Sequence, residues 1–67
     1  MAHLTEARLA ELVAADIAAA TACHDWCMAQ PSDYAGPPRK DLAEASYRAE
    51  VAVQEYRRAL REQNQAN

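Results

Sequence analysis

Two cysteines and a histidine are the first side chains in this sequence that could do chemistry. Cys23 and Cys27 are four residues apart, so they share one face if the segment is helical. Two thiolates from each of two subunits would complete a tetrahedral zinc site. However, His24 points about 100° away from Cys23 on a helix, and no CxxC pair is present. We therefore expect two free thiols that pack as small apolar groups, with no cofactor, and keep the shared metal site as the alternative.

No set of residues fits nucleophilic or general acid–base catalysis. Cys23 and His24 are adjacent in the chain, so they project in different directions, and no third residue is placed to orient the histidine. Catalysis by paired carboxylates needs two converging acids, whereas only Asp16 falls among apolar residues. The sequence therefore predicts a protein that is not an enzyme.

Asp16 is the most unusual residue of the alanine-rich run from Leu9 to Cys27. A carboxylate on an apolar face is costly unless it is paired or hydrogen-bonded. One interpretation is a polar pin that fixes the register of two helices, with Tyr56, Arg48 or an arginine of a second subunit as its partner. The other interpretation is an acid that belongs to a functional site.

The spacing of apolar residues and the turn signals predict two long helices. Thr5 is a suitable N-cap, flanked by Leu4 and Leu9 for a hydrophobic staple, and the first helix should span about 5–30 because Pro31 follows. Residues 31–37 carry turn signals, the second helix should span about 38–63, and the tail 64–67 should fray.

One face of each helix is expected to be buried. The face of the first comprises Leu9, Leu12, Val13, Asp16, Ile17, Ala20, Cys23 and Cys27. The face of the second comprises Leu42, Ala45, Ala49, Ala52, Val53, Tyr56, Ala59 and Leu60. Trp26 is expected outside the first face, as a cap over the loop end of the core. Two similar helices with a short link predict an all-α, antiparallel two-helix hairpin that forms a single domain over residues 1–67.

Small size and composition point to self-association. A domain of 67 residues is marginal alone, and 17 of its residues are alanine, which adds little burial. The first helix is apolar or small nearly all round, so it should have more than one neighbour. We expect a homodimeric four-helix bundle or a higher homo-oligomer.

Charge and cysteine usage disfavour several classes of partner and location. A net charge of −3 disfavours a nucleic-acid binder. Glu11 and Asp16 interrupt the only long apolar run, which argues against an export signal and against a membrane span. Free thiols favour the reducing cytoplasm. The alanine- and arginine-rich usage suggests a bacterial or phage source.

Two surfaces are candidates for binding. Tyr47, Val51 and Arg58 form an exposed strip on the second helix, and this combination suits a protein partner. The sequence therefore predicts a small interaction protein with an accessory, adaptor or inhibitor role. The alternative is a homo-oligomer that sequesters a small anionic or nucleotide ligand at the loop end or at the subunit interface. Its binding residues would be Trp26, Arg39, Lys40 and Arg48.

Overall fold

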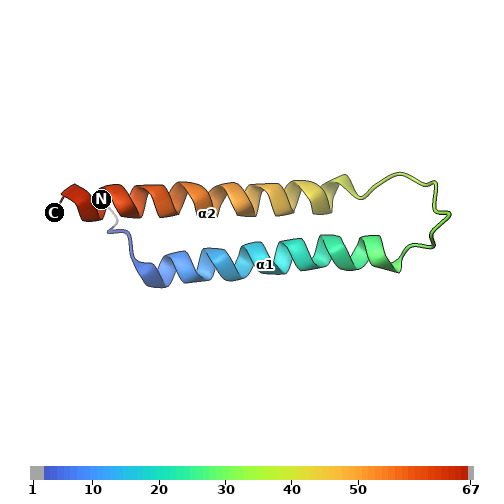
Figure 1. Ribbon diagram of the computed structural model, residues 1–67, viewed down its shortest axis with the longest axis horizontal. Coiled ribbons are helices and arrows are strands. Elements are labelled where there is room, and N and C mark those ends of the chain that lie inside the picture. The colour runs from blue at the N-terminus through green and yellow to red at the C-terminus, as the bar shows by residue number, and fades with distance from the viewer. Residues whose placement is uncertain (1–2, 67) are drawn as a thin grey trace.

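The protein is a rod made of two antiparallel helices. The computed structural model describes residues 3–66, with α1 at Glu6–Ala29 and α2 at Lys40–Ala66 (Figure 1). The helices pack against each other, and the molecule measures 55 × 17 × 16 Å. The prediction of an all-α helical hairpin is confirmed. The start of α1 and the end of α2 lie at the end of the rod opposite the connection (Figure 1).

The ends of α1 follow from two local signals. Thr5 has an extended backbone, and its Oγ1 accepts a hydrogen bond of 3.1 Å from the Arg8 N–H, which confirms it as the N-cap. At the other end, Pro31 disfavours a helical conformation of Gln30, which is extended with φ −81° and ψ 145°. The side-chain amide of Gln30 turns back and donates to the Trp26 carbonyl at 3.1 Å.

The bounds of α2 are shifted relative to the expected 38–63. Its first helical hydrogen bond runs from the Ala43 N–H to the Arg39 carbonyl at 3.3 Å, so Pro37 and Pro38 remain in the connection. Pro38 disfavours a helical conformation of Pro37, which explains why Pro37 lies outside the helix. At the other end, residues 64–66 were expected to fray but are helical, and Asn67 lies outside the described residues.

The connection is organised around Tyr34. Its N–H donates to the Pro31 carbonyl at 3.0 Å, and its hydroxyl donates to the Pro37 carbonyl at 3.0 Å. Its ring makes an edge-to-face contact with Trp26, with centroids 5.9 Å apart. A Cβ on Gly36 would lie 2.5 Å from the Cζ of Tyr34, so glycine is the residue that fits beside this ring. Trp26 thus meets Tyr34 at the loop end.

Inward residues follow intervals of three and four along both helices. On α1 they are half-buried: Leu9, Leu12, Val13, Asp16, Ala19, Cys23 and Trp26. On α2 the main series is Leu42, Ser46, Ala49, Val53, Tyr56, Leu60 and Gln63, with Ala52 and Ala59 half-buried beside it. This alternation is the heptad spacing of helices packed side by side at a small angle.

The inward face of α1 differs from the predicted face. Ile17, Ala20 and Cys27 are exposed, whereas Ala19 and Trp26 are half-buried. The helix is rotated so that the large Trp26 side chain loses water, and a tryptophan buries more surface than an isoleucine. On α2, Ala45 is exposed and Ser46 takes the inward position.

The core of this hairpin is thin. Val53 and Leu60 are each 5% exposed, and they are the only apolar residues among 3–66 that are buried. No described residue of α1 reaches that degree of burial. Neither of the two described helices is long and apolar enough to cross a membrane.

Candidate functional site

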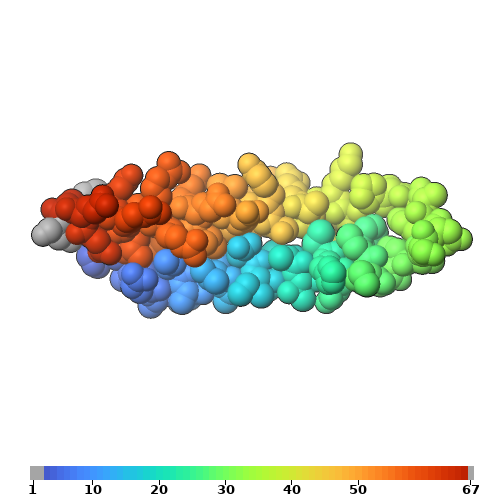
Figure 2. All heavy atoms as spheres, in the orientation of Figure 1, coloured from blue at the N-terminus to red at the C-terminus, as the bar shows by residue number. Residues whose placement is uncertain are grey.

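The candidate sites of this protein are surfaces. No pocket is found within residues 3–66, and Figure 2 shows the two helices in contact along the rod. The chemistry available to a partner therefore depends on which side chains project from α1, from α2 and from the two ends of the hairpin.

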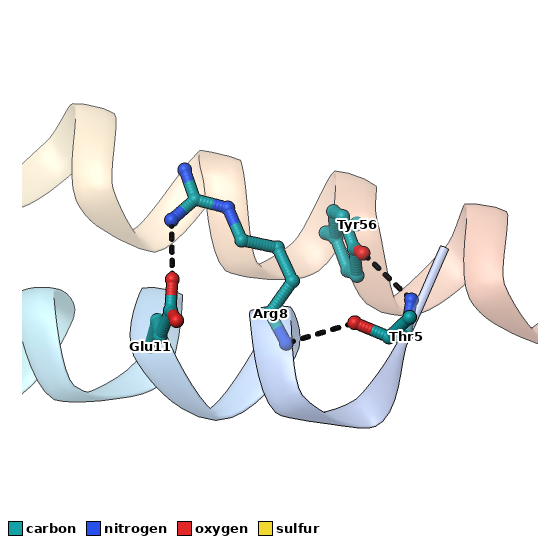
Figure 3. A network of polar contacts seen from close by, with 4 residues as sticks. All are labelled: Thr5, Arg8, Glu11 and Tyr56. Atoms are coloured by element: carbon teal, nitrogen blue, oxygen red, sulfur yellow. Dashed lines mark hydrogen bonds and ion pairs between the residues drawn. The ribbon is translucent and has the colours of Figure 1, made fainter. Parts of the chain in front are cut away.

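The open end of the hairpin is closed by a polar clamp, defined here as the side chains of Tyr56 and Gln63 bound to the backbone of Leu4 and Thr5. The Gln63 amide donates to the Leu4 carbonyl at 2.9 Å and accepts from the Leu4 N–H at 3.0 Å. The Tyr56 hydroxyl accepts from the Thr5 N–H at 2.9 Å (Figure 3). These bonds hold the chain just before α1 against α2. Sequence reasoning missed Gln63, because a glutamine near a chain end carries no distinctive signal.

Removal of the Gln63 side chain tests the polar clamp. We expect Gln63→Ala to lower the free energy of unfolding by about 1–2 kcal/mol, because two partly buried hydrogen bonds are lost. Hydrogen exchange of the Leu4 amide should become faster. Amides in the middle of α2 should stay ranked as in the wild type, from most to least protected. The exposed Gln65→Ala variant is the control and should leave both measurements unchanged. Equal effects of the two variants would contradict a specific clamp.

Asp16 lies on the inward face of α1 and is half-buried. No hydrogen bond or ion pair joins it to another of residues 3–66. The Tyr56 hydroxyl accepts a hydrogen bond from the Thr5 N–H instead, and Arg48 forms an ion pair with Glu44 at 2.9 Å. Both predicted partners within the chain therefore have other contacts. An arginine of a second copy stays the remaining prediction for the polar pin.

At the loop end, one of the expected anion-binding cations, Arg39, is engaged by an acid. Arg39 forms two hydrogen bonds to Asp41, of 2.8 and 2.6 Å. These bonds lower the pKa of the Asp41 carboxyl to about 2 and raise the pKa of Arg39. Trp26 is half-buried against Tyr34, and Lys40 is exposed in the first turn of α2. An anion at this end would therefore compete with Asp41 for Arg39 or bind Lys40 alone, and the alternative ligand site stays a prediction.

The two cysteines differ in exposure. Both are free; Cys23 is half-buried against α2, and Cys27 is exposed. No group of three histidine, cysteine or acidic side chains that could hold a metal is found within the described part of the chain. A metal site shared between two subunits therefore stays a prediction that needs a second copy to supply ligands.

The outer side of α2 carries the strip predicted to bind a partner, namely Tyr47, Val51 and Arg58. Tyr47 is 66% exposed, and Arg58 is also exposed. Val51 is half-buried, so it offers less surface than the sequence suggested. No ion pair engages Arg58 within residues 3–66, whereas Arg48 on the same helix is paired with Glu44.

The outer side of α1 carries exposed apolar and small residues beside the exposed acids Glu11 and Asp25, and sequence reasoning placed one of these apolar residues, Ile17, on the buried face. Ile17 is 61% exposed and Met28 is 71% exposed. The signal was present in the sequence as a second series of apolar and small residues, but periodicity alone does not say which series faces α2.

Comparison with known proteins adds no relative. The chain matches no family model, and neither curated proteins nor solved structures show a significant similarity to it. The structure itself defines the class of protein: a two-helix hairpin with a largely charged outer surface on α2 and with exposed apolar and small residues on α1.

Proposed function

We propose that this chain is a non-enzymatic interaction protein that associates with a second copy of itself and acts by binding a protein partner. An accessory, adaptor or inhibitor role suits a hairpin whose described residues form no pocket. The free cysteines fit an assignment to the reducing cytoplasm.

The observation that carries the proposal is the Tyr47–Val51–Arg58 strip. Tyrosine and arginine are the residue types that most often dominate the binding energy of protein interfaces. Tyr47 is 66% exposed on a helix whose inward face is already occupied by α1. The strip projects from a rigid helix, so a partner meets these side chains without first ordering the backbone.

Capture experiments with a double variant test this function. Immobilised wild-type protein is compared with the Tyr47→Ala, Arg58→Glu variant for the proteins each retains from its source cells. We expect the double variant to bind the specific partner at least about tenfold more weakly, since two interface anchors are lost. Arg57→Glu carries the same charge change at a neighbouring exposed position and should retain the partner. If the double variant retains the same proteins at the same yield while its oligomeric mass is unchanged, the strip is not the binding surface.

A further inference from the structure

The side of α1 that faces away from α2 carries a second series of residues at helix-packing intervals. We call this series the outer seam: Ala10, Ala14, Ile17, Thr21, His24 and Met28, all of them exposed. The intervals are four, three, four, three and four residues. The inward residues of the same helix show the same alternation, from Leu9 through Leu12, Asp16, Ala19 and Cys23 to Trp26. Spacing of this kind produces a straight stripe that fits another α-helix.

No charged side chain interrupts the middle of the outer seam. Between Glu11 and Asp25, the only formally charged residue is Asp16, which is half-buried on the inward face. Ile17 and Met28 expose 61% and 71% of their surface. The corresponding outer side of α2 carries Glu44, Arg48, Glu55, Arg58 and Glu62, all of them exposed to solvent. The outer side of α2 is therefore mainly charged, whereas the outer seam of α1 exposes apolar side chains to water.

The solvent-accessible surface area of the chain can be compared with that expected for a compact monomer of the same mass. The chain exposes 5259 Å². A folded monomer of its mass, 7.4 kDa, is expected to expose about 4,200 Å². The surplus of about 1,000 Å² belongs to the whole rod, which measures 55 × 17 × 16 Å, and it is comparable to the roughly 800 Å² that each partner buries in an interface of standard size.

We propose that the outer seam of α1 packs against the outer seam of a second copy of this chain, with the two α1 helices antiparallel. This inference rests on the self-association included in the proposed function and specifies its surface. A twofold dimer requires a self-complementary patch, and the outer seam supplies one because Ala10, Ala14 and Thr21 leave room for Ile17 and Met28 of the opposite copy. The antiparallel arrangement keeps each acid of α1 away from its own equivalent and sets the helix dipoles in opposite directions. The strip on α2 then remains open to a protein partner.

The mass in solution, measured by sedimentation equilibrium over a wide range of concentrations, tests this surface. We expect wild-type protein at twice its chain mass of 7.4 kDa, and Ile17→Lys at the monomer mass. Ala15→Lys is the matched control, since Ala15 is exposed on the same helix but lies outside the outer seam, and it should remain dimeric. Circular dichroism establishes whether each variant is helical. Should Ile17→Lys unfold, Ile17→Ala is used instead, and its dissociation constant should rise at least about tenfold, because each dimer contains the residue twice.

The outcomes separate the surface from the self-association itself. If the wild-type protein stays monomeric at every concentration, both the outer-seam dimer and the self-association in the proposed function are wrong. The outer seam would then bind a different molecule. A dimer that survives Ile17→Lys and Ile17→Ala overturns only the choice of surface. A wild-type mass above the dimer overturns the twofold pairing of α1 helices.

Discussion

Leu60→Ala is expected to lower the free energy of unfolding by about 2–5 kcal/mol, the range for truncation of a buried leucine. Leu60 is 5% exposed and is one of two buried apolar residues among 3–66. A chain of this length is expected to have a total stability of roughly 3–10 kcal/mol, so this one change removes a large share of it. Most of the molecules should then be unfolded at a temperature at which the wild type is still helical.

Thermal and urea unfolding followed by circular dichroism measure this effect. Leu60→Met keeps the volume and the apolar character of the side chain, and it should cost less than about 1.5 kcal/mol. All variants are compared at the same protein concentration, since self-association adds to the apparent stability. A loss below about 1 kcal/mol for Leu60→Ala would contradict the packing described for α2.

Asp16→Leu is expected to raise the free energy of unfolding by about 1–2 kcal/mol. The carboxylate occupies an inward position of α1, is half-buried and has no hydrogen bond to any of residues 3–66. Leucine at this position adds apolar burial against α2 and has a higher helix propensity. It also removes the cost of withdrawing a charged group from water without a partner.

Asp16→Asn separates charge from shape. If the missing partner is the cause, the asparagine variant should be slightly more stable than wild type, and the leucine variant more stable still. If Asp16 is instead the polar pin, tied to an arginine of a second copy, both variants should lose stability and the mass distribution in solution should change. Urea unfolding together with sedimentation distinguishes the two outcomes, and a destabilised leucine variant would overturn our expectation.

Much of the fold follows from local signals in the sequence. Thr5 was identified as an N-cap because a threonine before a helix-forming run can accept the free N–H of Arg8, and the structure contains that bond. Pro31 ends α1 for a steric reason that acts only on its neighbour. The inward series of α2 was largely predicted because charged residues fill its opposite side and leave a single choice of face. Alanine supplies nine of the 24 residues of α1 and lies on several sides of it, so periodicity offered two faces of similar hydrophobicity.

The candidate site depended on contacts between residues far apart in the chain. The prediction placed Ile17 and Cys27 inside and Trp26 outside the inward face of α1, whereas the structure reverses these positions. The reversal is set by α2 and by Tyr34, which together cover the tryptophan. The bonds from Leu4 to Gln63 span 59 residues, a separation over which no local preference acts.

Sequence by itself determined where the two helices begin and end to within three residues, because caps and prolines act over one turn. Only the tertiary structure decided which side of α1 is left exposed. That side depends on which rotation of the helix about its axis buries more surface against α2.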